Sequence, residues 1–244
     1  MEKDPVKLIE AALTEKIHLD PRKNPVRVSM AGNSVVMEGM VDGIAQKKRA
    51  LLIAMRVKGI EGVIDRLRVR PSVKMTDAEI KAHLQDAFAG EPSLAPCALK
   101  AEAHEGAIDL EGSVNSLTHK RLAGALAWWV PGVTDVINSI EVYPQEEDCD
   151  DEVVDALRLI IEKDPLVHPG SINISAKDWI VTLSGVAIGD TEKEAAEADA
   201  WYVWGVNEVV NAISVRKAAP YGAAAKETLQ HRPYRPHRLP LKKP

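Results

Sequence analysis

The stretch that decides the fold is Gly205–Val215, which reads GVNEVVNAISV. The same pattern recurs as GVTDVINSIEV at Gly132–Val142 and as GIEGVIDRLRV at Gly59–Val69. Successive copies are offset by 73 residues both times, and self-similarity at a fixed period is the signature of a repeat architecture. The chain therefore contains three copies of one small unit.

Further landmarks keep the same offset, so the register extends from the hairpin to the end of the unit, while the apolar face of the first helix in copy one is displaced by two residues. They are Gly39, Gly112 and Gly185, together with Lys47, Lys120 and Lys193. Because no insertion breaks the register, the sequence predicts repeats at 5–70, 76–143 and 149–216, followed by a tail at 217–244. Short linkers at 70–74 and 144–149 leave little freedom between the units.

Each unit begins with an amphipathic stretch and continues with alternating residues. Val153, Leu157 and Ile161 show the spacing that places apolar residues on one helical face. Helices are predicted first at 5–16, 77–89 and 150–163, and again at 44–58, 116–130 and 190–204. Alternation around a polar turn predicts a β-hairpin between the two helices, and the quoted glycine-valine stretch predicts the last strand.

The predicted fold is therefore α+β, with three tandem αββαβ domains. Each domain is expected to be a small three-stranded sheet covered on one face by two helices. Aromatic residues make up only 4% of the chain, so the cores must be built from aliphatic side chains. Because a core of this size is marginal alone, packing between the copies is expected.

Six glycines are expected to have structural roles. Gly39, Gly112 and Gly185 follow the second strand and predict a sharp exit or a close approach by the next helix. Gly59, Gly132 and Gly205 fall where a helix C-cap is expected.

Taken together, these motifs resemble the BON domain, named for bacterial osmotically inducible and nodulation proteins. The resemblance rests on a helix that ends near Asp20-Pro21 or Asp164-Pro165, a strand that leads to a Val/Leu-x-Gly motif, and the glycine-valine signature. The first copy departs conservatively, with Ile60 and Asp65 in the signature. The resemblance covers residues 5–216.

The resemblance implies a non-enzymatic, stress-related binding protein that associates with phospholipid membrane or envelope surfaces. A soluble protein-interaction scaffold without lipid binding is the alternative. The residues are consistent with the absence of enzymatic activity, since no phosphate-binding loop, zinc-protease motif or nucleophile elbow occurs. No metal or cofactor is expected, and Cys97 and Cys149 match no metal or redox spacing.

The second helices of copies two and three end in aromatic residues, which are candidates for surface binding. They are Trp128, Trp129, Trp201, Tyr202 and Trp204. Leu122, Leu126 and Trp129 form a second apolar stripe beside Ala123 and Ala127, and a helix apolar on two faces packs against a second partner. That partner is a neighbouring copy or another subunit, or else the aromatic residues form a membrane-interface or ligand surface.

The C-terminal tail is basic although the whole chain has a formal net charge of −5. Its candidate binding residues are Arg232, Arg235, Arg238, Lys242 and Lys243. Its composition predicts a disordered segment that anionic lipid would attract. Electrostatic contact with nucleic acid, an extended protein partner and a solvated tail without a partner stay open, and no specific nucleic-acid recognition is expected.

The N-terminus, MEKDP, lacks the basic start and apolar run of a secretory signal. No stretch approaches the roughly 20 apolar residues of a membrane span. The sequence therefore predicts a cytoplasmic protein without a transmembrane segment, and peripheral attachment to a membrane is compatible with that location. The oligomeric state stays undetermined.

Overall fold

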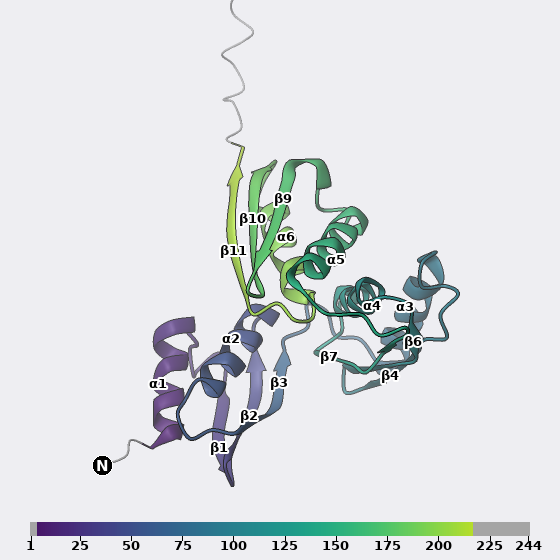
Figure 1. The fold of residues 1–244 in the computed structure, drawn as a ribbon. Helices are drawn as coiled ribbons and strands as arrows, with labels where there is room; N and C mark the ends of the chain where they lie inside the picture. Colours follow the sequence, from purple (N-terminus) through teal and green to yellow (C-terminus); the bar gives the residue numbers. More distant parts are fainter. Residues whose placement is uncertain (1–3, 217–244) are drawn as a thin grey trace, which may run out of the picture.

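A computed structural model describes residues 4–216 and shows three repeats of the same secondary structure (Figure 1). Repeat 1 contains α1 (Pro5–Ile17), β1 (Val26–Ala31), β2 (Ser34–Val41), α2 (Ile44–Met55) and β3 (Gly62–Val69). Repeat 2 contains α3 (Asp77–Gly90), β4 (Lys100–His104), β5 (Ala107–Glu111), β6 (Ser113–Val114), α4 (Leu117–Trp129), β7 (Asp135–Asn138) and β8 (Glu141–Val142). Repeat 3 contains α5 (Asp150–Lys163), the 3-10 turn η1 (Pro169–Ser171), β9 (Ile172–Lys177), β10 (Ile180–Ala187), α6 (Asp190–Tyr202) and β11 (Glu208–Val215).

Each repeat has a mixed three-stranded sheet with the second strand in the middle. In repeat 1, β1 and β2 form an antiparallel hairpin, and β3 lies parallel to β2. Repeat 3 has the same arrangement. In repeat 2 the second and the last strand are each divided in two, so that β6 and β8 form a short separate pair. The parallel pairing requires a crossover, which the second helix supplies. The predicted α+β fold of three αββαβ units is confirmed, and the predicted tail at 217–244 lies outside the described residues.

The glycines of the second strands allow a close approach by the backbone, although not by the next helix as expected. Gly39 and Gly185 lie within β2 and β10, and all three glycines have a positive φ, at 142°, 123° and 122° in chain order. An added Cβ would collide with the carbonyl oxygen that precedes the neighbouring strand, which belongs to Pro25, Ala98 or Ser171. Glycine is required here because no other residue combines this φ with this contact.

The second group of glycines follows the helices rather than capping them directly. The C-caps of α2, α4 and α6 are Arg56, Val130 and Val203. Gly59 and Gly205 turn the chain with a positive φ, at 89° and 94°. Gly132 does not, and an added Cβ there would collide with Met75 and Ile80. The expected C-cap role is therefore replaced by a turn in two copies and by close packing in one.

The buried side chains form two hydrophobic cores rather than three. Repeats 2 and 3 share one continuous core, in which α4 packs against α5 as well as against its own sheet. Repeat 1 has a separate core around Ile9, Leu13, Met37 and Leu67. Repeats 2 and 3 are therefore a single packing unit, to which repeat 1 contributes Ile44 of α2 and is held by further contacts.

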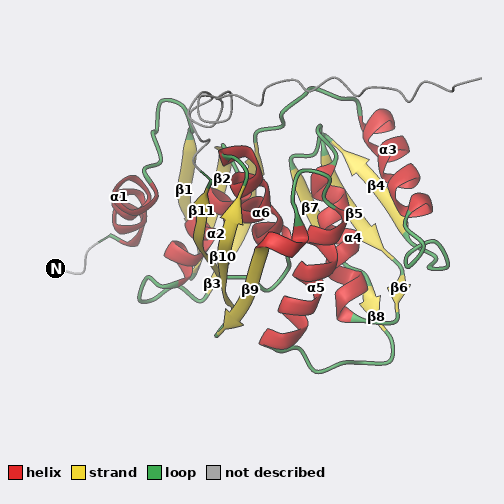
Figure 2. Ribbon diagram, turned by 90° about the horizontal axis from the view of Figure 1, so that it is seen from above, coloured by secondary structure: helices red, strands yellow, loops and turns green. Residues whose placement is uncertain are grey.

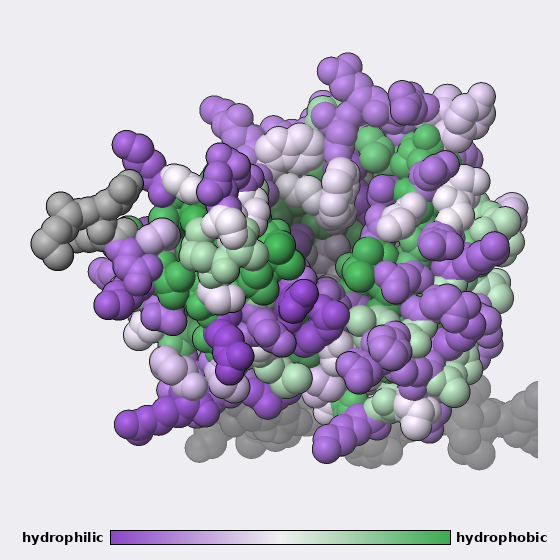
Figure 3. Space-filling view, turned by 90° about the horizontal axis from the view of Figure 1, so that it is seen from below, coloured by the Kyte–Doolittle hydropathy of each residue, from purple (hydrophilic) through white to green (hydrophobic). Residues whose placement is uncertain are grey.

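The arrangement places the helices that touch other repeats in the middle of the molecule. The helices α1 and α3 lie at opposite ends, while α2, α4, α5 and α6 lie between them (Figures 1 and 2). Both α2 and α4 pack against α6. Apolar patches on the face shown in Figure 3 are broken by hydrophilic residues, and that face is hollowed near its middle.

Within residues 4–216, no helix is long and apolar enough to cross a membrane.

Candidate functional site

The aromatic helix ends meet at the junction of the three repeats. Trp201 is only 1% exposed and belongs to the shared core. The rings of Trp128 and Tyr202 stack at 5.8 Å between centroids and 10° between planes. Trp129 donates from Nε1 to Asp199 Oδ1 at 2.9 Å. Most of these side chains therefore hold one repeat against the next.

The prediction that Trp201 binds at the surface is wrong, because its indole is buried and Arg49 of repeat 1 lies over it. Trp128, Trp129 and Tyr202 are half-buried at the junction. Trp204 differs from them, since it is 51% exposed. It is the member of this set whose side chain is most available to a partner.

Cations from repeats 1 and 2 lie over the indoles of repeat 3. Arg49 lies 4.8 Å and Lys48 6.0 Å from the centroid of Trp201. Lys120 lies 5.2 Å from the centroid of Trp204. Such cation–π contacts stabilise by about 0.5–1 kcal/mol at exposed sites and by more when desolvated. They explain how aromatic residues of one repeat recognise basic residues of another.

A buried ion network joins repeat 1 to repeat 2. Lys47 Nζ lies 2.5 Å from Asp135 Oδ1 and 3.0 Å from Asp65 Oδ2, and it donates to the Leu67 carbonyl at 2.8 Å. Arg68 Nη1 contacts the other oxygen of Asp135 at 2.8 Å. Both Lys47 and Asp135 are buried, so each supplies the charge that the other requires away from water.

Lys48 is placed differently, because no carboxylate of residues 4–216 contacts its ammonium. Its Nζ donates to the carbonyl oxygens of Val203 at 2.9 Å and Val206 at 3.4 Å. Burial lowers the pKa of Lys48 to about 7, since desolvation disfavours the charged form. The next residue, Arg49, does have an anionic partner and contacts Glu208 at 2.6 Å.

Arg121 connects repeat 2 to repeat 3. It is 0% exposed. Its Nε donates to the Trp204 carbonyl at 3.0 Å, and its Nη2 contacts Asp148 at 2.6 Å. Its Nη1 has no hydrogen-bond partner among the described residues. A buried guanidinium nitrogen without an acceptor is costly.

These groups surround a cavity of roughly 520 Å³ that all three repeats line. Basic side chains line it on several sides, and Trp128, Tyr202 and Trp204 supply aromatic walls. Ile137, which is 48% exposed, lines it as well. A second cavity of roughly 550 Å³ shares Ile44, Trp128 and Tyr202 with the first. Volumes of this size are typical of small-ligand sites.

A carboxyl group is buried at the interface between α4 and α6. Burial raises the pKa of Asp199 to about 8, the hydrogen bond from Trp129 opposes this shift, and the negative charge of Asp164 adds to it. Asp199 Oδ2 has no hydrogen-bond partner among residues 4–216. The raised pKa favours the protonated form of Asp199, which relieves the repulsion from Asp164.

The basic residues that the sequence predicts as a binding segment, at 232–243, lie outside the described residues. The residues that build the junction were missed at the sequence level. Lys47 has one signal, its recurrence at the 73-residue offset. Lys48, Arg68, Arg121 and Asp199 have none, because their partners belong to other repeats. Among the described residues, no three His, Cys, Asp or Glu side chains gather as a metal site.

Three αββαβ units in one chain, joined around a charged and aromatic junction, define a tandem-repeat α+β protein. The BON domain family model matches residues 6–71, 76–144 and 150–217. The chain therefore belongs to the BON domain family.

The osmotically-inducible protein Y of Escherichia coli (strain K12) is 29% identical over 143 residues, which cover 54% of this chain and 68% of that protein. Neither that protein nor the BON domain belongs to an enzyme family. Two structures of CdsD, a structural protein of the type III secretion system of Chlamydia trachomatis, are 15% identical with a TM-score of 0.23. They cover 89% and 87% of this chain, and 100% and 92% of their own chains.

The Lys47 network predicts that repeat 1 detaches when the lysine is removed. Lys47→Met should lower the free energy of unfolding by about 3 kcal/mol, because Asp135 and Asp65 lose a buried counter-charge. Urea denaturation should then show repeat 1 unfolding before the other two. Lys193→Met is the matched control, since Lys193 occupies the equivalent position and donates to the Ile213 carbonyl. It should cost about 1 kcal/mol, and equal losses in both variants would contradict the assignment.

The buried Asp199 predicts a pH dependence of stability. A carboxyl whose pKa is raised in the folded state binds its proton more tightly there, so stability is full at acidic pH and falls as the pH rises toward about 8. Asp199→Asn should remove this decline and raise the free energy of unfolding at pH 8 by about 1–3 kcal/mol. Thermal unfolding between pH 5 and 8 measures the difference.

The control for this titration is Asp155→Asn, which changes an exposed carboxylate on α5. It should leave the pH profile parallel to that of the unchanged protein. A decline that persists in Asp199→Asn would show that another group titrates. Titration of Lys48 has the opposite effect on the free energy of unfolding, since its lowered pKa adds stability as the pH rises above about 7. Lys48 is present in both variants, so its effect cancels when their pH profiles are compared.

Proposed function

We propose that this chain is a non-enzymatic, osmotic-stress-related binding protein that associates with anionic phospholipid surfaces. The stress-related role rests on the similarity to the osmotically-inducible protein Y and on membership of the BON family. The surface role rests on Trp204, whose exposed indole stands beside the cations Lys120 and Arg121. In this proposal, the protein is located in the cytoplasm and attaches to the membrane peripherally.

The chemistry of this patch fits a lipid–water interface. Tryptophan is favoured at the level of the headgroups, because its ring is apolar and its N–H is polar. Each basic side chain near an anionic membrane contributes about 1 kcal/mol of attraction. Trp204, Lys120 and the exposed Ile137 combine both properties. The basic tail would add to the same attraction and would make it sensitive to salt.

Co-sedimentation with phosphatidylglycerol vesicles tests this function. The full chain should bind at low salt, release at high salt and ignore phosphatidylcholine vesicles. Trp204→Ala should weaken binding on the order of tenfold, a loss of about 1.4 kcal/mol. Truncation of the unchanged chain after Lys217 should also weaken vesicle binding and reduce its salt dependence.

Ile188→Ala is the matched control, because Ile188 is an exposed apolar residue at the other end of α6. It should bind vesicles as the unchanged chain does. A protein that ignores anionic vesicles at low salt would contradict the proposed function.

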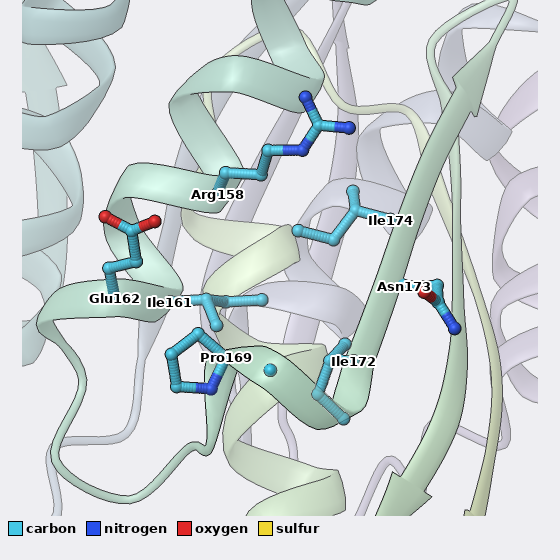
Figure 4. Close-up of a pocket in the computed structure, with 8 residues that line it drawn as sticks. Arg158, Ile161, Glu162, Pro169, Ile172, Asn173 and Ile174 are labelled. Atoms are coloured by element: carbon cyan, nitrogen blue, oxygen red, sulfur yellow. The ribbon is translucent and has the colours of Figure 1, made fainter.

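A protein-interaction scaffold is the second candidate, favoured by a cleft in repeat 3. The cleft is roughly 430 Å³, and α5 and β9 form its walls (Figure 4). Ile161, Ile172 and Ile174 line it, and Asn173 points away from it. Because β9 is the edge strand of its sheet, an extended peptide could add to its free edge and place alternate side chains in the cleft.

Ile174→Arg separates the two candidates. For a scaffold, this charge in the cleft should abolish the capture of protein partners from a cell extract by the immobilised chain. It should leave vesicle binding unchanged, because the cleft does not include Trp204. Identical captured proteins in both samples would exclude this cleft as the interaction site.

A further inference from the structure

The second cavity at the junction, of roughly 550 Å³, has mainly aromatic and aliphatic walls that come from all three repeats. Trp128, Trp129 and Tyr202 are its aromatic lining. Val130 and Val133 line it as well, and both are buried. A cavity of this size with a largely apolar lining and a few polar groups is typical of a small-molecule site.

The charged side chains that line this cavity are two carboxylates and one guanidinium. Arg70 Nε lies 3.2 Å from Asp42 Oδ1, so these two charges offset each other. Asp164 lines the cavity from the loop that follows α5, and it forms no ion pair within residues 4–216. Its neighbour Lys163 contacts Glu91 instead, at 2.8 Å. One negative charge of the lining is therefore not offset by a described side chain.

The negative charge reaches the Tyr202 wall of this cavity. Burial raises the pKa of Tyr202, and the negative charges of Asp199 and Asp164 add to this shift. Both carboxyl groups therefore lie near the phenol. Asp199 is buried and does not line the cavity, so Asp164 is the carboxylate that a ligand in the cavity can reach.

The aromatic residues of the junction differ in their cationic partners. Trp201 and Trp204 each have two basic side chains over the ring. Within the described part of the chain, no basic side chain lies over Trp128, Trp129 or Tyr202. An aromatic face attracts a cation, and tryptophan does so most strongly. This cavity therefore combines aromatic walls with a carboxylate, and no described basic side chain serves either of them.

We propose that this cavity binds a small organic cation with a quaternary ammonium group, held by Asp164 and the aromatic walls. A primary ammonium needs acceptors for three N–H donors, and Asp164 Oδ1 already accepts from the Leu166 N–H at 2.8 Å. A quaternary ammonium has no N–H to satisfy, and aromatic walls are the usual means of recognising it. The inference goes beyond the proposed function, because Trp204 does not line this cavity.

Isothermal titration calorimetry of the full chain with choline tests the site, and two analogues test its chemistry. The neutral tert-butyl analogue of choline keeps the shape without the charge, so it should bind at least about tenfold more weakly. Ethanolamine keeps the charge but has N–H donors, and it should also bind about tenfold more weakly. Equal affinity for choline and its neutral analogue would overturn the cation site, and equal affinity for ethanolamine would overturn the quaternary preference.

Three variants assign the binding to this cavity. Asp164→Asn should weaken choline binding about tenfold, because the amide keeps the acceptor for the Leu166 N–H and loses the charge. Trp128→Leu should weaken it roughly fivefold. Asp155→Asn, which changes an exposed carboxylate of α5, should bind choline as the unchanged chain does. If Trp128→Leu fails to fold by circular dichroism, Asp164→Asn still decides, and unchanged affinity in that variant would show that the site is wrong.

Two other sources of the cation are separated by further measurements. Phosphatidylcholine vesicles carry the same ammonium on a lipid headgroup, and vesicle binding that depends on Asp164, without binding of free choline, would assign the site to the headgroup and overturn a free ligand. Truncation after Lys217 removes the basic residues at 232–243 and should leave the choline affinity unchanged. Tighter binding by the truncated chain would show that the tail competes for the cavity. Absence of binding to both choline and phosphatidylcholine would overturn the site altogether.

Discussion

The packing of α4 on two sides is the constraint on which the rest of the structure depends. One face, with Ala123 and Ala127, covers the sheet of repeat 2, and the neighbouring residues Leu122 and Leu126 are buried with it in the core shared with repeat 3. Small residues let a helix approach its sheet closely, and the larger ones fill the space on the other side. Because α4 packs between the sheet of repeat 2 and the helices of repeat 3, the aromatic ends of α4 and α6 meet. This contact forms the junction of the repeats.

Repeat 1 is held by a different kind of interaction. Its core is separate, although Ile44 reaches the core of repeats 2 and 3, and its ion pairs with the other repeats join Lys47 to Asp135 and Arg49 to Glu208. Apolar packing is tolerant of small shifts, whereas a buried ion pair is stabilising only in one geometry. The charged contacts therefore specify where repeat 1 sits, and they place Lys48 beside the junction cavity with carbonyl partners from repeat 3.

The junction of the three repeats also connects structure to binding. A small three-stranded sheet with two helices has little interior of its own, and the junction adds two cavities that all three repeats line. The junction gathers donors from α2 and α4 and aromatic walls from α4 and α6. Trp204 lines the junction cavity and remains half exposed, which places the candidate membrane contact next to this cavity.

The sequence by itself determined the three repeats, the order of their helices and strands, and the second apolar stripe on α4, because periodicity and glycine positions are local properties of the chain. It also indicated the aromatic helix ends as a special feature, although it wrongly predicted that Trp201 lies at the surface. Only the tertiary structure decided that Trp201 is buried, that Lys48 donates to the Val203 carbonyl and that Asp199 lies near Asp164. These facts depend on how one repeat is oriented against another, and an orientation set by side chains about 70 to 160 residues apart leaves no periodic trace in the sequence.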